Sequence, residues 1–245
     1  MVMPVKQRCP KCGDVFMGSD CIGDPCHRCV RASYRSEKLE HTLPLDTTRR
    51  IPYIHTWSGK QFFYGTQDTE VYLPDIAAQL AQQTRFTGAT KKPYWIAQHA
   101  VVVANILEEW GCDALTALYG LHHDDHEFCT SDLATPFQIW LTDLNGGRNI
   151  VEEAKTFLDN LIFPRLDLPW PPHPGIWEIV KMADASAFIC EAEQLFANKP
   201  NWTQEYVERK KVRRVDMPIP FVSSCEAHML FLETHSRLWQ KYKPV

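Results

Sequence analysis

The sequence lacks any long hydrophobic run and any excess of basic charge. No stretch of its 245 residues approaches the roughly 20 consecutive apolar residues of a membrane-spanning helix. Lysine and arginine number 26 against 30 aspartates and glutamates, so no overall basic field attracts nucleic acid. The segment MVMPVKQRCP has no apolar core and no cleavage signature of a signal peptide. We therefore expect a soluble, cytoplasmic protein without membrane contact, in which an anionic substrate would need local cations or a metal.

Nine cysteines are present, but their distribution argues against a disulfide framework. Five fall within the first thirty residues, and the other four are scattered singly through helix-like sequence, where thiols usually behave as small hydrophobic groups. The clustered ones include two CxxC pairs, made by Cys9, Cys12, Cys26 and Cys29. Four thiolates complete a tetrahedron and leave no open position, which favours one structural zinc over reactive thiols or a disulfide. We predict a zinc-ribbon-like unit over residues 1–35, in which Cys21 or His27 could replace one ligand.

The rest of the chain reads as a linker, a hairpin and a helical body. Residues 36–50 are polar and aperiodic, as in a linker. Residues 53–57 and 61–64 are rich in β-prone residues and flank Ser58-Gly59, which predicts a β-hairpin. Beyond it, apolar spacing predicts an all-α domain within residues 51–245, with helices at about 74–83, 93–110, 113–127, 149–161, 175–197, 202–212 and 222–241. Five prolines within 163–175 predict a stiff loop.

The stretch LHHDDHEFCTSDLATP, residues 121–136, concentrates histidines and carboxylates at the end of a predicted helix. At 100° per residue, His123, Asp124 and Glu127 share one sector, and small residues upstream, such as Gly120, let another helix approach that sector. A neutral imidazole beside a carboxylate suits a metal ion. This sector is therefore a candidate metal site, which needs further ligands from other helices.

Two isolated polar residues in apolar helices supply candidates. His99 and Asp184 each lie in strongly apolar sequence, and a bundle core is where side chains from several helices build metal sites. Taken singly, His99 could be a hydrogen-bonded buried histidine, and Asp184 could pair with Lys181. A competing ligand pair is His122 with His126, spaced i, i+4.

The order His99, then His123-Asp124, then Asp184 resembles the H…HD…D signature of the HD-domain metal-dependent phosphohydrolases, over about residues 50–200. More narrowly, IHTWSGKQFFY and YWIAQHAVVVANIL are similar to the 5′-deoxynucleotidase-like branch, which occurs in bacteria and phages and includes phage enzymes that remove triphosphate from dATP. The resemblance implies an HD-domain helical bundle. It also implies a cytoplasmic location, which would be the host cytoplasm if a phage encodes the protein.

The resemblance also implies roles. One divalent cation (cobalt, manganese, magnesium or zinc) would be held by His99, His123, Asp124 and Asp184, and Glu127 would act as general acid/base. Such a cation neutralises phosphate oxygens and lowers the pKa of bound water, while a positioned carboxylic acid can protonate the leaving oxygen.

Substrate contacts carry over in the same way. Arg85, fourteen residues before His99, resembles a phosphate-binding arginine, and Lys181 is placed to touch phosphate. Asp132 resembles the carboxylate that reads the 3′-hydroxyl of deoxyribose. Two further pocket positions are Gly88 and Trp95.

Three departures leave substrate identity open. The branch usually has Gly-His-Thr where this chain has Gly88-Ala89-Thr90, a small residue where Trp95 stands, and a phosphate-reaching lysine where Gln138 stands. None of them affects the implied metal ligands, but each could reshape the base or phosphate pocket.

We therefore expect a metal-dependent phosphohydrolase of 2′-deoxynucleotides, foremost a 5′-deoxynucleotidase that cleaves monophosphates. A deoxynucleoside triphosphate triphosphohydrolase with a dATP preference is the alternative enzyme. A different class is a nucleic-acid-binding protein that uses the zinc ribbon and the basic run 207–214 around a non-catalytic core, which we do not favour. HD enzymes often form dimers, so a homodimer stays open.

Overall fold

The computed structural model describes residues 5–8, 15–18 and 51–242. Strands β1 (Val5–Arg8) and β2 (Val15–Gly18) pair antiparallel, with Val5 opposite Gly18. The predicted zinc ligands and the linker at 36–50 lie outside the described residues, so the zinc ribbon and the domain boundaries stay predictions; these ligands are Cys9, Cys12, Cys26 and Cys29.

The predicted β-hairpin is confirmed in a shorter form. Strands β3 (Tyr53–His55) and β4 (Gln61–Phe63) pair antiparallel around a turn in which Gly59 has φ +82°. The turn is fastened to helix α2 (Leu73–Leu80), because Asp75 accepts 2.9 Å hydrogen bonds from the amide and hydroxyl of Ser58. The hairpin is therefore attached to the helical body through polar contacts as well as through its buried Phe62.

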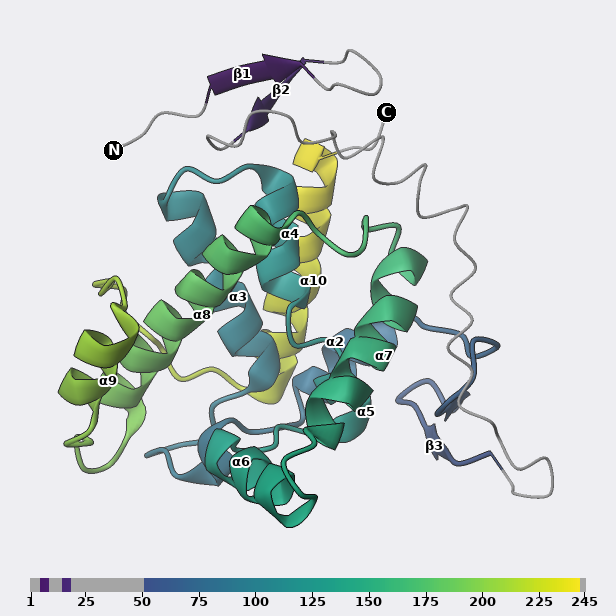
Figure 1. Ribbon diagram of the computed structural model, residues 1–245, viewed down its shortest axis with the longest axis horizontal. Coiled ribbons are helices and arrows are strands. Elements are labelled where there is room, and N and C mark those ends of the chain that lie inside the picture. The colour runs from purple at the N-terminus through teal and green to yellow at the C-terminus, as the bar shows by residue number, and fades with distance from the viewer. Residues whose placement is uncertain (1–4, 9–14, 19–50, 243–245) are drawn as a thin grey trace.

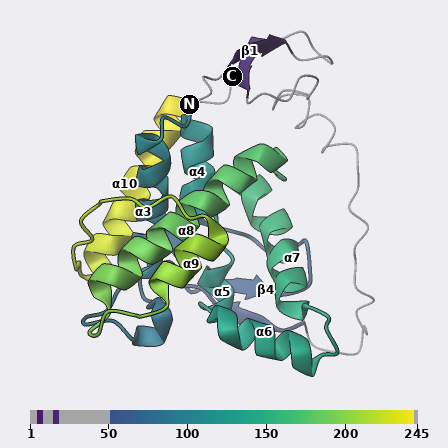
Figure 2. The same cartoon turned by 60° about the vertical axis from the view of Figure 1, so that its left-hand side comes forward.

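Four helices form the centre of the molecule. Helices α3 (Ile96–Glu109), α4 (Ala114–His122) and α10 (Ser224–Tyr242) pack against one another, and α8 (Pro174–Leu195) crosses α3 and α4 (Figures 1 and 2). Helix α3 is apolar almost all round and eleven of its fourteen residues are buried, as expected for a helix covered by neighbours on several sides.

Local signals set the ends of these helices. Gly111, with φ +78°, follows the last turn of α3 and stops it. Asp113 then caps α4, since its carboxylate accepts a 2.8 Å hydrogen bond from the amide of Thr116. Gly120 lets α3 and α4 approach closely: a Cβ there would lie 2.3 Å from Leu107 Cδ1. The predicted role of the small residues on α4 is thus confirmed.

The remaining helices are shorter or lie nearer the surface, and they complete the helical body. They are η1 (Phe86–Gly88), α5 (Glu127–Thr130), α6 (Thr135–Leu144), α7 (Ile150–Arg165) and α9 (Thr203–Lys210). The predicted all-α fold class is thus confirmed over residues 51–242. None of the helices within the described ranges is long and apolar enough to cross a membrane.

Three details differ from the sequence expectation. Helix α6 was not predicted, and none of its residues is buried, so it lacks the buried stripe that marks a helix in sequence. Helix α7 continues to Arg165 because Leu161–Phe163 are buried against the core, which shortens the expected proline-rich loop. Helix α4 ends at His122, and residues 123–126 form turns before α5 begins at Glu127.

Side chains from α2 and from the residues just after β4 and α2 hold this broken segment in place. The carbonyls at the end of a one-turn helix have no partners within the helix. Gln79 donates to the carbonyl of Phe128 at 2.9 Å, Gln83 donates to that of Glu127 at 3.1 Å, and the Tyr64 hydroxyl donates to that of Cys129. The segment that carries the HD pair is thus fixed from outside its own helix.

Candidate metal centre

Four side chains from three separate segments converge. His99 Nε2 of α3 lies 3.2 Å from Asp184 Oδ1 of α8 and 3.8 Å from Asp124 Oδ2. His123 Nε2 lies 3.1 Å from Asp124 Oδ2 and 3.7 Å from Asp184 Oδ1. The predicted ligand set is therefore brought together in space, with two nitrogens and two oxygens around one point.

The two imidazoles are held in the form that a metal needs. Their Nε2 atoms are buried and have no hydrogen-bond partner. On the other side of each ring, His99 Nδ1 lies 2.7 Å from Glu191 Oε1, and His123 Nδ1 lies 2.7 Å from the carbonyl oxygen of Gly120. Because a carbonyl only accepts and the buried Glu191 pKa is lowered, both Nδ1 atoms donate, and both Nε2 atoms face the centre, where a bound cation would displace any proton they carry.

Such orphaned buried atoms fit a cation. An unpaired buried polar atom costs on the order of 1–3 kcal/mol, and one divalent ion would satisfy both nitrogens. His99, His123 and Asp124 each offer a ligand atom within 4.8 Å of the others. The carboxylate side gives access to solvent, since the side chains of Asp124 and Asp184 are 14% and 29% exposed, whereas those of both histidines are 0% exposed.

The electrostatics of the centre agree with this geometry. Burial alone would raise the pKa of Asp124 and of Asp184, but the neighbouring imidazoles hold both pKa values well below the usual one. Burial conversely lowers the pKa of His123, yet the two carboxylates beside it raise that pKa to about 10. The pair of ionised carboxylates thus demands positive charge at this point, which a divalent cation supplies.

Glu191 is a functional residue that the sequence reasoning missed. It is fully buried, and besides His99 it accepts a 2.7 Å hydrogen bond from the Tyr94 hydroxyl. Its second oxygen lies 3.4 Å from Nε of Arg85, whose Nη1 lies 3.6 Å from Asp124 Oδ2. A signal for it exists in the sequence: Glu191 follows Asp184 by seven residues, two helical turns later, in the same apolar helix.

Arg85 is buried between carboxylates. Burial lowers its pKa, but the charges of Glu191 and Asp124 outweigh that effect and raise it. It therefore remains a fixed positive charge at the edge of the centre, held by Glu191 and directed toward Asp124.

The pKa of Glu127 is shifted in the opposite direction from the pKa values of Asp124 and Asp184. Glu127 is 3% exposed, and its Oε2 has no hydrogen-bond partner. Burial and then the charges of Asp124 and Asp132 raise its pKa well above the usual value. These surroundings therefore favour the protonated form of Glu127, which is the form that a general acid needs.

Two other predicted substrate residues, Asp132 and Lys181, affect the pKa values of groups at the metal centre or are affected by them. Asp132 acts on the pKa values of both Arg85 and Glu127. Just before it, Ser131 adopts φ +65° and ψ 161°, a backbone region that is nearly restricted to glycine. The side chain of Lys181 on α8 reaches solvent, with its Nζ 5.0 Å from the centre of the Trp177 ring. Partial desolvation by the surrounding protein lowers its pKa, but the charges of Asp124 and Asp184 outweigh this and raise it.

The other predicted pocket positions are less directly engaged. The indole N–H of Trp95 donates to the carbonyl of Val222 at 2.9 Å, so it is already hydrogen-bonded within the protein. Gly88 has φ +77° in the turn after Arg85 and keeps a backbone form that glycine favours. Gln138, at the lysine position, donates to the carbonyl of Leu133.

The competing ligand pair is not brought together. His122 Nδ1 lies 2.7 Å from Asp125 Oδ2, and His122 Nε2 lies 2.8 Å from His235 Nδ1 of α10. Both of its nitrogens therefore have partners other than His126, whose own Nδ1 lies 2.9 Å from Asp159 Oδ1.

The basic run at 207–214 is partly engaged by the fold. Arg214 Nη1 lies 2.8 Å from Glu193 Oε2, and the guanidinium of Arg213 lies 4.6 Å from the centre of the Trp110 ring. These contacts support a structural role for two of its arginines.

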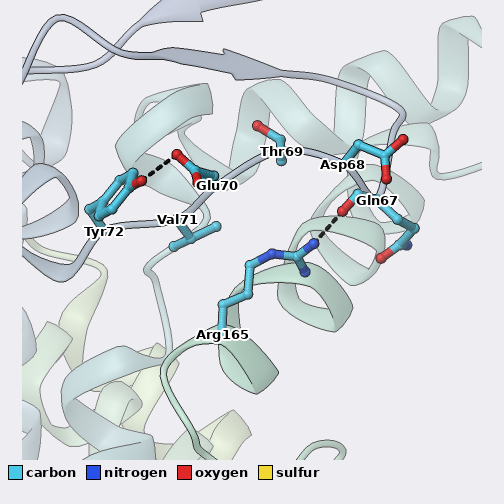
Figure 3. A pocket seen from close by; sticks show the side chains of 7 residues that line it. All are labelled: Gln67, Asp68, Thr69, Glu70, Val71, Tyr72 and Arg165. Carbon is cyan, nitrogen blue, oxygen red and sulfur yellow. Dashed lines mark hydrogen bonds between the residues drawn. The ribbon is translucent and has the colours of Figure 1, made fainter.

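A surface depression of about 390 Å³ is formed by other residues (Figure 3). It is lined by residues 67–72 and by Arg165, which donates to the carbonyl of Gln67. It contains none of the metal-directed side chains, so the chemistry argues for the carboxylate-edged centre as the functional site instead.

Comparisons with known proteins bear on this arrangement. The chain is 32% identical to the uncharacterized protein YfdR of Escherichia coli (strain K12) over 147 residues, which are 59% of this chain and 73% of YfdR. The chain belongs to the YfdR family. No family model matches it. Among solved structures, the cyanophage S-2L HD phosphohydrolase DatZ, bound to dA and one catalytic Zn²⁺ ion, is similar with a TM-score of 0.47 and 18% identity, over 70% of this chain and 99% of DatZ.

Membership of the YfdR family names no activity, so the chemistry must come from the site. In the present chain, the side chains that could hold an ion come from α3, from the turn after α4 and from α8, and Glu191 orients His99 of α3.

Proposed function

We propose that the protein is a metal-dependent phosphohydrolase of 2′-deoxynucleotides that removes phosphate from the 5′-monophosphate. The observation that carries the proposal is the convergence of two unpaired Nε2 atoms with two ionised carboxylates, at a point open to solvent on the carboxylate side. His99, His123, Asp124 and Asp184 would hold one divalent ion, such as cobalt, manganese, magnesium or zinc. When bound, the ion would neutralise phosphate oxygens and lower the pKa of a bound water.

The residues around the ion would carry the remaining work. Arg85 would bind the phosphate through its planar guanidinium, because Glu191 holds it in place and the negative charges nearby keep it ionised. Lys181, exposed at the other side of Asp184, would attract the same anion. Two cations at the edge of the centre explain how a chain with a net charge of −4 can bind an anionic substrate.

Glu127 would supply the proton. Its raised pKa favours the protonated form, which would protonate the departing 5′-oxygen and then accept a proton from the attacking water. The hydrogen bonds from the Gln79 and Gln83 side chains fix the backbone carbonyls of Phe128 and Glu127, which would hold the acid in position. Proton transfer by a positioned group is typically worth 10²–10⁴ in rate.

The sugar preference would come from Asp132. This residue follows the strained Ser131, and its charge acts on the pKa values of both Glu127 and Arg85, so it lies within electrostatic reach of both. A carboxylate there would accept a hydrogen bond from the 3′-hydroxyl and would disfavour ribose. The preference for a monophosphate is supported by Gln138, which bonds to the Leu133 carbonyl and adds no charge for further phosphates.

The test is a panel of deoxy- and ribonucleoside mono- and triphosphates, incubated with the protein in cobalt, manganese or magnesium. We expect inorganic phosphate from deoxynucleoside monophosphates and little from ribonucleotides. Glu127→Gln keeps the size of the side chain and removes the acid, so it should lower kcat by at least about 100-fold while metal content is unchanged.

Other outcomes assign the alternatives. Tripolyphosphate from a single deoxynucleoside triphosphate would replace the monophosphate proposal with a triphosphohydrolase. No product from any nucleotide, with protein shown to hold metal at this centre, would reject both. Nucleic-acid affinity that persists in Asp124→Ala would then favour a binding protein.

A further inference from the structure

The turn that follows Arg85 has a strained backbone. Phe86, Thr87 and Gly88 have φ values of +55°, +51° and +77°, so three successive residues lie in the left-handed region. Glycine adopts this region freely, whereas a residue with a Cβ is disfavoured there and keeps such a conformation only when its surroundings impose it. Packing elsewhere in the fold must therefore hold Phe86 and Thr87 in this form.

Aromatic side chains from α8 and α9 provide that packing. The ring of Phe86 is stacked on that of Phe188 in α8, with 5.6 Å between their centres, and meets Phe196 edge-on at 5.0 Å. Behind Phe188, the ring of Trp202 is stacked at 5.3 Å, and that of Tyr206 in α9 lies 5.3 Å away. Helix α9 lies against α8 (Figures 1 and 2), so a continuous aromatic group runs from α9 to the turn.

The ring of Phe86 also supports the side chain of Arg85. The guanidinium carbon of Arg85 lies 5.4 Å from the centre of this ring, within the range of a cation–π contact. The ring reaches this place only because the backbone of Phe86 is left-handed. If the turn relaxed, the ring would move away and the guanidinium would lose this contact.

Helix α8 links this support to the metal centre. Asp184, Phe188 and Glu191 are spaced four and then three residues apart, which places them along one side of the helix. Asp184 is directed at the metal, Phe188 stacks on Phe86, and Glu191 lies 3.4 Å from Nε of Arg85. One rigid helix therefore fixes Arg85 relative to the centre.

We propose that Phe188 is a positioning residue for phosphate binding: by stacking on Phe86, it keeps the turn 86–88 in its strained form and Arg85 beside the metal centre. The inference rests on the proposed function, since it takes Arg85 as the residue that binds phosphate. Packing and strain then oppose each other. Weaker packing should let the turn relax, and removal of the strain should make the packing less necessary.

The test measures the binding of inorganic phosphate to the full chain by calorimetry, with Mg²⁺ present. Phe188→Leu stays apolar but loses the stacking surface, so it should raise the Kd for phosphate by about 3–10-fold. Its Kd for Mn²⁺ should be unchanged, because the metal-directed residues are retained. Phe157→Leu, at a partly buried phenylalanine of α7, is the matched control and should bind phosphate as the original chain does.

A second substitution separates positioning from a general loss of packing. Thr87 is exposed, and glycine in its place would adopt the left-handed form without strain. Thr87→Gly added to Phe188→Leu should therefore return the Kd for phosphate toward the original value. Thr87→Ala keeps the Cβ and the strain, so it should restore nothing. A purely structural role for Phe188 predicts the same Kd in both double variants.

Trp202→Leu is a milder variant for the case in which Phe188→Leu does not fold. Trp202 is 36% exposed and lies behind Phe188, so its loss should raise the Kd for phosphate in the same direction by a smaller factor. Circular dichroism would show which variants keep their helical content.

Unchanged phosphate affinity in folded Phe188→Leu, or equal affinity in the glycine and alanine double variants, would overturn the inference. Failure of the proposed function gives a different result. Protein that binds phosphate with the expected pattern but hydrolyses no nucleotide would reject the enzyme and keep the positioning role. Turnover with a KM that Phe188→Leu leaves unchanged would do the reverse.

Discussion

At the scale of single residues, the metal centre depends on a carboxylate that would not touch the ion. Glu191 binds His99 Nδ1, Tyr94 and the Arg85 side chain at once, so it sets the tautomer of a ligand and the position of the phosphate-binding group. Its burial is tolerated because Oε1 accepts from Tyr94 and His99, and the charge of Arg85 lies 3.4 Å from Oε2.

Glu191→Gln should therefore weaken the centre without dismantling it. The amide keeps the size of the side chain but loses the charge that favours a donating Nδ1, so we expect the Kd for Mn²⁺ to rise by about 10–100-fold. Glu193→Gln, two residues further along α8 and paired with Arg214, is the matched control and should bind as the original does. Equal Mn²⁺ affinity in both variants would contradict the role given to Glu191.

Ser131 is a second residue with a clear prediction. Its φ of +65° and ψ of 161° cost a side chain on the order of 1–3 kcal/mol, and glycine adopts them freely. Ser131→Gly should raise the free energy of unfolding by about 1 kcal/mol, after the greater flexibility of the unfolded glycine chain is subtracted.

Chemical denaturation would measure this effect. Ser131→Ala retains a Cβ and therefore the strain, so it should stay close to the original stability. A glycine variant that is less stable than the alanine variant would show that the strain is absent in solution.

At the scale of elements, the packing of α3 on α4 places His99 beside the turn that carries His123. The contact depends on Gly120, where a Cβ would meet Leu107 Cδ1 at 2.3 Å and Val103 Cγ1 at 3.3 Å. Both of those side chains are buried, so neither can simply turn into solvent.

Gly120→Ala should destabilise the protein by about 1–2 kcal/mol, because overpacking outweighs the gain in helix propensity. A double-mutant cycle gives the sharper measurement. Leu107→Ala alone should leave a cavity, and adding Gly120→Ala should then cost less than it does in the original chain, with a coupling of about 0.5–2 kcal/mol. Additive effects would mean that the two side chains do not meet.

The same scale shows what could be predicted from the sequence. Helices with a buried apolar pattern, such as α3 and α8, were predicted nearly to their ends, since burial leaves a pattern in the residues. Helix α6 was missed because no residue of it is buried. The break after His122 was missed because the side chains that bond to the carbonyls of α5 come from α2 and the turn after it, as Gln79 and Gln83, and the sequence near the break contains no sign of them.

The candidate site divides in the same way. The four metal-directed residues could be predicted from metal-competent side chains in apolar surroundings. The partners that orient the histidines could not, because Glu191 and the Gly120 carbonyl matter only through a three-dimensional contact. The predicted roles of Arg85, Asp132, Lys181, Gly88 and Trp95 toward substrate stay predictions.

At the scale of the whole molecule, a chain of buried polar contacts joins α10 to the metal-bearing segment. His235 of α10 bonds to His122, which bonds to Asp125, and the ring of His235 stacks on Trp239. Burial, followed by the neighbouring His122, lowers the pKa of His235 from 6.5 to about 3.

This depressed pKa predicts how stability depends on pH. Between about pH 6.5 and 3 the unfolded chain binds a proton at His235 that the folded chain does not, so stability is fully present above 6.5 and is lost as pH falls. The loss should be smaller than about 1.4 kcal/mol per pH unit, because the ring is partly exposed. His235→Gln cannot titrate, so its unfolding free energy should fall less between pH 7 and pH 5 than that of the original chain. Parallel pH profiles of the two proteins would contradict the assignment.

The spread of the ligands along the chain has a consequence for biosynthesis. The metal-directed side chains lie at positions 99, 123, 124 and 184, so a ribosome must make α3, α4 and α8 before the set is complete. The nascent chain can form the local contact of α3 with α4 early, but at that stage it offers only three of the four side chains. Tight metal capture at this centre should therefore follow the docking of α8, late in synthesis, and a stalled chain that ends before Asp184 should not bind an ion tightly there.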